Sequence, residues 1–314
     1  MGEFELLARI RERLPADGPR IRLGSGDDAA ITVPEGATAT SVDALVDGVH
    51  FRRDDATPAQ IGHKALATAL SDLAAMGAEA GEAYAVLGLP GDFGEDECVD
   101  LLEGMLALAE STGTSLVGGD ITRSPALFLA ITVVGHAPSA GALVSRNGAS
   151  PGDALVLTGD LGAAGAALRA PGEEELRARQ LEPTPRLRAG RALAASGATA
   201  MVDLSDGLGA DAGHLAEASE VGLRIEAEVI PLAPRARQLS EAEGSSPWWL
   251  LSAGEDYELL ASIPPERLEQ AIDSVRDAEG IALTPIGEVL AGSGVEIRLP
   301  GGGRAEPGGF DQLA

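Results

Sequence analysis

The amino-acid sequence predicts a mixed protein of the α+β or α/β class, built from two domains that are each a sandwich of sheet and helices. In both halves, short apolar runs rich in β-branched residues alternate with longer stretches of helical periodicity. The chain has 314 residues, which is the length of two ordinary domains. Residues 147–152 form a turn-rich segment, so we expect one domain over residues 1–147 and a second over residues 148–314.

The first half is expected to contain a long helix that begins at Thr57 and Pro58 and extends to Gly77. Threonine is a favoured N-cap, and proline is favoured at the first helical position, where its missing N–H costs no hydrogen bond. Helices are also predicted over residues 3–14 and 96–112, and strands over residues 29–33, 39–46, 84–89 and 127–134.

The second half repeats the alternation of strands and helices, which is why a second sandwich is predicted. Strands are expected over residues 154–158, 200–202, 223–227, 258–263 and 283–289, and helices over residues 209–220 and 266–279.

The charge balance excludes two classes of partner. The chain carries 23 Lys and Arg against 49 Asp and Glu, a formal charge of −26. Nucleic acid and acidic membrane surfaces would both repel such a protein, so we expect it to bind neither. A hydrophobic content of 45% separates it from intrinsically disordered chains of similar charge.

Cysteine usage and hydropathy indicate a protein of the reducing cytoplasm. Cys98 is the only cysteine, so no disulfide can form within the chain. The first residues lack the basic and apolar regions of a secretory signal. The apolar run over residues 126–134 is much shorter than the ~20 residues of a membrane span, so we predict no transmembrane segment.

Aspartates recur beside Gly or Ser at the predicted strand ends and turns. Any one of them is explained by turn capping, in which the carboxylate accepts hydrogen bonds from nearby backbone. Six such places favour a second interpretation, because carboxylates that gather in space need cations, and hard oxygen ligands select Mg²⁺ or Ca²⁺. Mg²⁺ in turn implies a phosphate ligand. The six places are Gly24–Asp28, Ser41–Asp43, Ser71–Asp72, Gly118–Asp120, Asp203–Gly207 and Gly254–Asp256.

Two nucleotide-binding motifs are excluded. Residues 24–29 fit the Gly-x-Gly-x-x-Ala dinucleotide pattern, but Asp27 and Asp28 would repel an approaching pyrophosphate. No Gly-x-x-x-x-Gly-Lys-Ser/Thr sequence occurs, so the chain has no P-loop. A nucleotide would therefore be held in another way, for which phosphates bridged by metal ions are the simplest arrangement.

Four further residues are candidates for a site, and three of them also have a structural interpretation. Lys64, the only lysine, would contact a phosphate or lie on a solvated helix face. Arg146 would bind a nucleotide phosphate or form an ion pair between domains. His50 would face a ligand or be a hydrogen-bonded structural histidine. Phe310 lies in a glycine-rich tail and would stack on an aromatic ligand.

Taken together, these segments resemble the thiamine-monophosphate kinases, a family of the aminoimidazole-ribonucleotide-synthetase-like superfamily. The similarity extends over nearly the whole chain. The segments that carry it are Gly26–Ala29, Ser41–Phe51, Lys64–Gly77, Val117–Asp120, Asp203–Leu208 and Gly254–Leu259.

The resemblance implies that the γ-phosphoryl group of ATP is transferred in line to thiamine monophosphate, with the help of several Mg²⁺ ions. It implies an N-terminal domain that binds metal and ATP and forms a homodimer, and a C-terminal domain that completes the substrate site. Metal ligands would be Asp27, Ser41, Val42 (through its carbonyl), Asp43, Asp72, Asp120, Asp203 and Asp206, of which Asp27, Asp120 and Asp206 would be catalytic. ATP would contact Gly119, Asp120, Arg146 and Ser205, and thiamine monophosphate would contact His50, Glu255 and Phe310.

Two positions depart from the family pattern, and both concern the adenine side of the site. Ile121 follows Asp120 where the family usually has a hydroxyl residue. Ser111 lies near the position at which the family often has an aromatic residue against adenine. The alternatives are another ATP-dependent enzyme of the superfamily, of the purine-pathway synthetase type, or a nucleotide-binding regulator without turnover.

Overall fold

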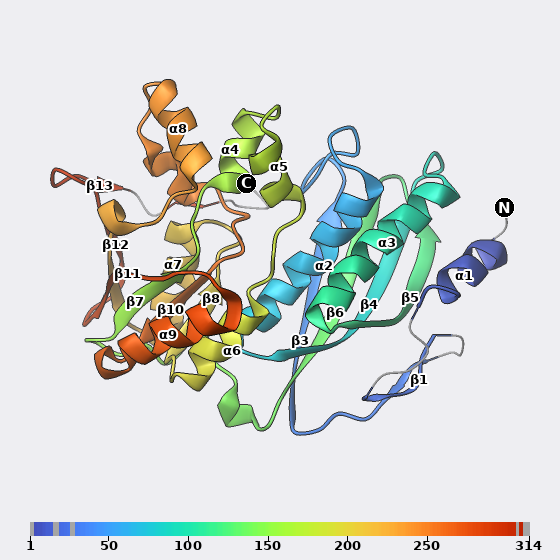
Figure 1. The fold of residues 1–314 in the computed structure, drawn as a ribbon, viewed down its shortest axis with the longest axis horizontal. Helices are drawn as coiled ribbons and strands as arrows, with labels where there is room; N and C mark the ends of the chain where they lie inside the picture. Colours follow the sequence, from blue (N-terminus) through green and yellow to red (C-terminus); the bar gives the residue numbers. More distant parts are fainter. Residues whose placement is uncertain (1–2, 15–18, 26–28, 306–307, 310–314) are drawn as a thin grey trace. The chain divides into compact units, whose positions relative to one another are not determined.

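The computed structural model describes residues 3–14, 19–25, 29–305 and 308–309. The chain divides into two compact units, one of Met1–Leu73 and Ala78–Ala140, the other of Ala74–Gly77 and Gly141–Ala314. Each unit contains a sheet and helices (Figure 1), so the prediction of a mixed α and β protein is confirmed.

The first unit is built on a four-stranded sheet. Its strands are β3 (Ala37–Val46), β4 (Glu79–Leu89), β5 (Ser115–Arg123) and β6 (Phe128–Ala137). Their spatial order is β3-β6-β4-β5, with β4 and β5 parallel and the other neighbours antiparallel. The strands β3 and β5 therefore form the two opposite edges of the sheet. A small separate sheet pairs β1 (Ile21–Leu23) with β2 (Ile31–Thr32).

Two long helices, α2 (Pro58–Ala75) and α3 (Glu95–Thr112), cover one face of this sheet (Figure 1). On that face Leu129, Ile131 and Val133 of β6 are almost completely buried. The two helices cross very closely, because glycines stand where they meet. A Cβ atom on Gly104 would lie 1.9 Å from the carbonyl oxygen of Ala59. Because this oxygen belongs to the backbone, no change of side-chain conformation could remove the clash.

Part of the other face of the four-stranded sheet is open to solvent in the single chain, although Glu82 and His136 at one end of that face are buried. Val42 of β3 is 65% exposed and Val86 of β4 is 36% exposed. Thr132 and Val134 of β6, which belong to the same face, are only partly buried. Apolar side chains on an uncovered sheet face are typical of a surface that binds a partner.

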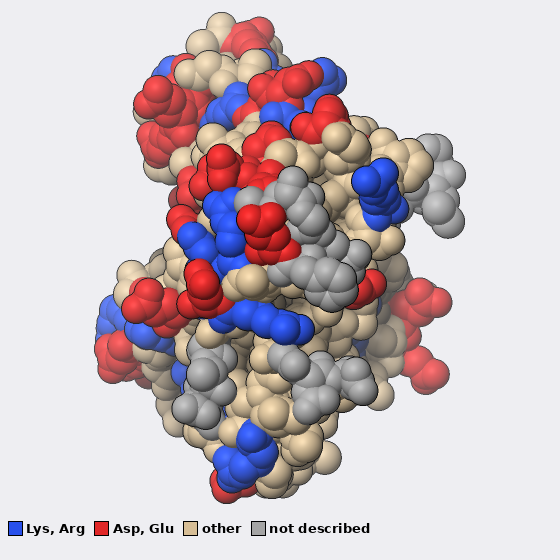
Figure 2. Space-filling view, turned by 90° about the vertical axis from the view of Figure 1, so that its right-hand side faces the viewer, with Lys and Arg blue, Asp and Glu red and all other residues tan. Residues whose placement is uncertain are grey.

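The leading helix α1 (Glu3–Arg11) is tied to α3 by ion pairs. Arg9 pairs with Glu95 at 3.3 Å and with Asp96 at 3.0 Å, and Arg13 pairs with Glu103 at 3.3 Å. Figure 2 shows that over part of this face basic and acidic side chains lie next to one another. These arginines thus offset part of the negative charge of the chain.

The second unit is built on a seven-stranded sheet with the order β13-β12-β9-β11-β7-β10-β8. Only β12 and β9 are parallel. The strands are β7 (Ala154–Thr158), β8 (Ala200–Asp203), β9 (Gly222–Glu226), β10 (Leu259–Ile263), β11 (Leu283–Leu290), β12 (Gly294–Arg298) and β13 (Arg304–Ala305). The helices are α4 (Ala163–Arg169), α5 (Glu174–Leu181), α6 (Leu187–Ala195), α7 (Leu208–Ser219), α8 (Pro234–Ala242) and α9 (Leu268–Glu279).

One hydrophobic core joins the sheet of this unit to its helices. It includes Leu155 and Leu157 of β7, Val202 of β8 and Leu215 of α7, all at most 1% exposed. Because β8 is buried at every position, packing on both sides of the strand fixes the backbone that carries Asp203 at its end.

The predicted element pattern was incomplete in both units. The strand β5 was not predicted, because Gly118, Gly119 and Asp120 are turn-forming residues when they are considered alone. They form a strand here because β4 pairs with them along its length. The short helices α4, α5, α6 and α8 and the strands β1, β12 and β13 were also missed.

None of the described helices is both long enough and apolar enough to cross a membrane.

A pair of glycine substitutions tests the helix crossing. We expect Gly104→Ala to lower the free energy of unfolding by about 1–3 kcal/mol, because the new methyl group collides with the Ala59 carbonyl. The control is Gly213→Ala in α7, where no described atom lies within 4 Å of the new Cβ. That variant should keep or gain stability, by up to about 1 kcal/mol, because alanine favours a helix. Urea unfolding curves measure both, and equal effects would contradict the close crossing.

Candidate active site

In the first unit, three expected metal ligands lie at the β3 edge of the sheet. Ser41 and Asp43 point to the same face of β3, since they are two residues apart. The hydroxyl of Ser41 donates a hydrogen bond to the carboxylate of Asp72, on the last turns of α2. A carboxylate near a helix C-terminus is disfavoured by the helix dipole, so a cation would stabilise this arrangement.

The side chain of Val42 lies on the opposite face of β3 from Ser41 and Asp43. Its expected contribution is the carbonyl oxygen, for which the side chain is not needed. That role stays a prediction.

Gly119 and Asp120 lie at the other edge of the same sheet, on β5. Gly119 is opposite Ala85 of β4, and its own Cβ would be only 1.8 Å from the Ala85 carbonyl oxygen. Glycine is therefore required for this close approach of two backbones. Asp120 is exposed and pairs with Val86, so it points to the face that the helices leave uncovered.

The sheet order separates Asp43 from Asp120. Three strand spacings of about 4.8 Å place β3 and β5 roughly 14 Å apart. The register also turns the two carboxylates to opposite faces, because Asp43 belongs to the row of Ile131 and Ala85. Two ligands of one Mg²⁺ ion each lie about 2.1 Å from it. Within one chain, therefore, Asp43 and Asp120 cannot share a cation.

His50 lies in the loop that follows β3, and Lys64 of α2 holds that loop. The backbone N–H of Val46 donates to His50 Nδ1 at 3.1 Å, and Lys64 Nζ donates to the carbonyl oxygen of His50 at 3.4 Å. Lys64 is only 1% exposed, so its interpretation as a residue of a solvated helix face is wrong. The burial of Lys64 was not predicted. The helix α2 is apolar on most of its circumference, and a lysine can be buried along its aliphatic stem.

In the second unit, two acidic loops lie side by side. The N–H of Glu255 donates to the carbonyl oxygen of Ser205 at 2.8 Å, and the N–H of Tyr257 donates to that of Leu204 at 2.9 Å. These bonds continue the pairing of β10 with β8, in which Leu259 is opposite Asp203. Asp203, Ser205 and Glu255 are thus brought to one end of the same sheet.

Asp206 is joined by two residues that the sequence did not single out, Asp211 and His214 of α7. Ligand atoms of these three side chains all lie within 4.8 Å of one another. Asp211 also accepts hydrogen bonds from the N–H groups of Asp206 and Gly207, each at 3.0 Å. Burial, and then the charges of Asp203 and Asp206, raise the pKa of Asp211 to about 7. The sequence feature that could have indicated Asp211 and His214 is their i, i+3 spacing, which places both side chains on one face of a helix.

The loop that carries Glu255 has an unusual backbone. Gly254, Glu255 and Tyr257 have φ angles of +72°, +59° and +51°. The left-handed conformation costs a residue with a side chain roughly 1–2 kcal/mol, so it persists only where the surroundings enforce it. Gly254 is required, because a Cβ there would lie 2.6 Å from the Ser205 carbonyl oxygen. Such strain is common at functional sites.

Three other expected residues have weaker structural support. Arg146 is exposed, and its carbonyl oxygen accepts a hydrogen bond from Ser219 Oγ at 2.8 Å. Asp27 and Phe310 lie outside the described residues. Gly309, which precedes Phe310, is close to the start of α7, since a Cβ on it would be 2.9 Å from the carbonyl oxygen of Asp206.

Comparison with known proteins identifies the family. Residues 26–137 match the family model of the AIR synthase related protein, N-terminal domain, and residues 150–300 match the C-terminal domain. The chain is 39% identical to the thiamine-monophosphate kinase of Salmonella typhimurium over 302 residues, which covers 92% of this chain and 91% of the relative. The chain belongs to the thiamine-monophosphate kinase family.

Two solved structures of thiamine-monophosphate kinases support this membership. The kinase from Stenotrophomonas maltophilia is 36% identical, with a TM-score of 0.85, and covers 97% of this chain and 98% of its own. The structure of AaThiL complexed with AMPPCP and TMP is 30% identical, with a TM-score of 0.78, and covers 98% of this chain and 96% of its own. The expected membership of the thiamine-monophosphate kinase family is confirmed.

Proposed function

We propose that this protein transfers the γ-phosphoryl group of ATP to the phosphate of thiamine monophosphate, giving thiamine diphosphate and ADP. The observation that carries this proposal is the 39% identity to a thiamine-monophosphate kinase across both domains. The AaThiL complex with AMPPCP and TMP supports the choice of both substrates. The same identity favours the kinase over a purine-pathway synthetase, and no observation favours a regulator without turnover.

The donor groups at the proposed site suit Mg²⁺. Ser41, Asp43 and Asp72 in the first unit, and Asp203 and Asp206 in the second, offer only hydroxyl and carboxylate oxygens, which are the ligands that Mg²⁺ prefers. We assign them, with Asp27, Asp120 and the Val42 carbonyl, to hold several ions. When bound, Mg²⁺ offsets the repulsion between the phosphate groups of the two substrates.

The remaining assigned residues bind and orient the substrates. Gly119 has no side chain that would hinder a phosphate, and the guanidinium of Arg146 suits two phosphate oxygens. Ser205 would add a hydroxyl contact to ATP. The acceptor oxygen is already ionised near pH 7, so the residues need to position it rather than to remove a proton.

His50, Glu255 and Phe310 are assigned to thiamine monophosphate. Glu255 offers a negative charge to the cationic thiazolium ring, and Phe310 offers a face for aromatic stacking. In this proposal the domain of residues 1–147 binds metal and ATP, and the domain of residues 148–314 completes the substrate site.

We also propose a homodimer formed by the first unit. It is supported by the uncovered sheet face that includes Val42 and Val86. It is supported further by the separation of Asp43 from Asp120 on opposite edges of the sheet. If β5 of one copy lies beside β3 of the other, as in a closed barrel, Asp120 of one copy comes within one strand spacing of the Asp43 backbone of its partner instead of three. Each site then takes Asp43 from one copy and Asp120 from the other, and the two carboxylates, which leave the sheet on opposite faces, bind different ions of that site.

A cytoplasmic location is part of the same proposal. It is supported by cysteine usage, because Cys98 is the only cysteine of the sequence and no disulfide can form within the chain.

Asp120→Asn tests the assigned metal role. We expect thiamine diphosphate formation by the wild type to require Mg²⁺, and turnover of the variant to fall roughly 100-fold or more, because a charged ligand is lost. Since Asp120 is exposed, the thermal midpoint should be unchanged. The control is Asp100→Asn, an equally exposed carboxylate on α3, which should keep full activity. Wild-type kinetics of Asp120→Asn at limiting Mg²⁺ would contradict the assignment.

Mixing two inactive variants tests the shared site. In a mixed dimer of Asp43→Asn and Asp120→Asn chains, one site carries both substitutions and the other carries neither. We expect about a quarter of wild-type turnover after unfolding and refolding the two together, because about half of the dimers are mixed and each has one intact site. If both residues of a site came from one chain, mixing would restore nothing. Light scattering establishes the dimer independently.

A further inference from the structure

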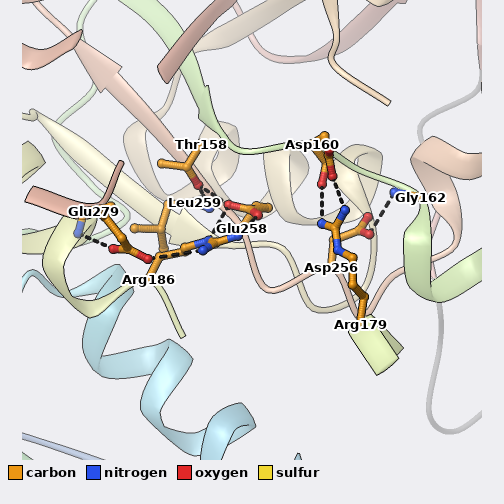
Figure 3. A network of polar contacts seen from close by, with 10 residues as sticks. Thr158, Asp160, Gly162, Arg179, Arg186, Asp256, Glu258, Leu259 and Glu279 are labelled. Carbon is orange, nitrogen blue, oxygen red and sulfur yellow. Dashed lines mark hydrogen bonds and ion pairs between the residues drawn. The ribbon is translucent and has the colours of Figure 1, made fainter. Parts of the chain in front are cut away.

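In the second unit, Asp256 and Glu258, which closely follow Glu255 in the chain, take part in polar contacts with several neighbouring residues (Figure 3). At the centre of this network is Glu258, which is completely buried. Its carboxylate accepts hydrogen bonds from the hydroxyl of Thr158 at 2.6 Å and from Arg186 Nε at 2.9 Å. A Cβ on Gly159 would lie 2.2 Å from the same carboxylate, so the space around Glu258 is filled.

The network continues on both sides of Glu258. Arg186 also donates to Glu279 at 3.2 Å, and Glu279 accepts the N–H of Ala189 at 2.8 Å. Burial alone would lower the pKa of Arg186, but the charges of Glu258 and Glu279 outweigh it, so that its pKa is raised and the guanidinium stays charged. Thr158 completes the link to the sheet, because its Oγ accepts the N–H of Leu259 at 2.8 Å.

A second anchor holds the loop from its other side. The carboxylate of Asp256 accepts the N–H of Gly162, just before α4, at 2.8 Å. Although Asp256 as a residue is partly exposed, its carboxyl group is enclosed by protein. Asp256 and Glu258 thus hold the backbone on either side of Tyr257, one of the residues in the left-handed conformation.

Asp256 and Glu258 are not among the residues expected to contact a substrate, but their hydrogen bonds hold the loop that carries Glu255, which is expected to contact thiamine monophosphate. The strained angles at Glu255 and Tyr257 would relax if the flanking residues could move. The same loop hydrogen-bonds to the backbone of Leu204 and Ser205, next to the assigned metal ligands Asp203 and Asp206. Stability alone does not explain a buried network of charges, because removing charges from water costs free energy and apolar residues of similar size often stabilise a core equally well.

We propose that Glu258, held by Thr158 and Arg186, is a positioning residue that fixes the Glu255 carboxylate for recognition of the cationic substrate. Asp256 acts in the same way from the other side of the loop. This inference rests on the proposed function, which assigns Glu255 to thiamine monophosphate.

The substitutions Thr158→Val and Thr158→Ser provide a matched pair. Valine keeps the shape of threonine but removes the hydroxyl that joins Glu258 to Leu259, whereas serine keeps the hydroxyl. We expect Thr158→Val to raise the KM for thiamine monophosphate roughly tenfold while the KM for ATP stays within about twofold. Thr158→Ser should restore the wild-type KM. Circular dichroism at the assay temperature verifies that both variants are folded.

A double-mutant cycle separates positioning from a merely structural role. If Thr158 acts through Glu255, then Thr158→Val will add nothing to the KM of a Glu255→Gln variant. An equal increase in both backgrounds, or an unchanged KM in Thr158→Val, would overturn the inference. If Thr158→Val does not fold, Glu279→Gln replaces it in the same cycle, because glutamine still accepts the Ala189 N–H and the change lies farther from the sheet.

The outcomes also distinguish this inference from the function on which it rests. If the wild type forms no thiamine diphosphate, the proposed function fails. If it does, but Glu255→Gln leaves the KM unchanged, the assignment of Glu255 fails, and the positioning inference with it. If Glu255→Gln raises the KM but the cycle is additive, only the positioning inference fails.

Discussion

Repulsion between carboxylates that the fold brings together is the constraint on which this site depends. Ser41, on the same face of β3 as Asp43, hydrogen-bonds to Asp72 of α2, and Asp203 ends a strand whose every residue is buried. Ligand atoms of Asp206 and Asp211 lie within 4.8 Å of each other. Burial raises the pKa of Asp211, and the charges of Asp203 and Asp206 raise it further. Divalent cations, which we propose for this site, would relieve the repulsion, and the reaction brings further negative charge because both substrates carry phosphate groups.

Backbone geometry decides which of these carboxylates can act together. In the second unit, continued pairing beyond β8 and β10 brings the two acidic loops side by side, and a buried charge network holds the more strained of them. In the first unit, strand order has the opposite effect and separates Asp43 from Asp120. One fold therefore assembles part of the site within each unit and leaves part of it to a second copy, as we propose.

Much of this could be predicted from the sequence, and the failures have physical causes. Alternating apolar runs predicted most of the long helices and sheet strands, because periodicity records burial directly. The strand β5 was missed because its glycines form pairs only in tertiary context. The solvated-face interpretation of Lys64 failed because a polar end group does not reveal a buried stem. Asp211 and His214 were missed because only the fold brings them to Asp206. Motifs predicted the remaining candidate site residues, but no motif contains the strand order that separates Asp43 from Asp120.

The most direct test of the central claim is diffraction at the manganese absorption edge, from crystals grown with Mn²⁺, AMPPCP and thiamine monophosphate. The account predicts anomalous peaks within about 2.5 Å of carboxylate oxygens in both acidic groups, that of Asp43 and Asp72 and that of Asp203 and Asp206. Ions that contact only the phosphates, with both carboxylate groups turned away from them, would contradict it.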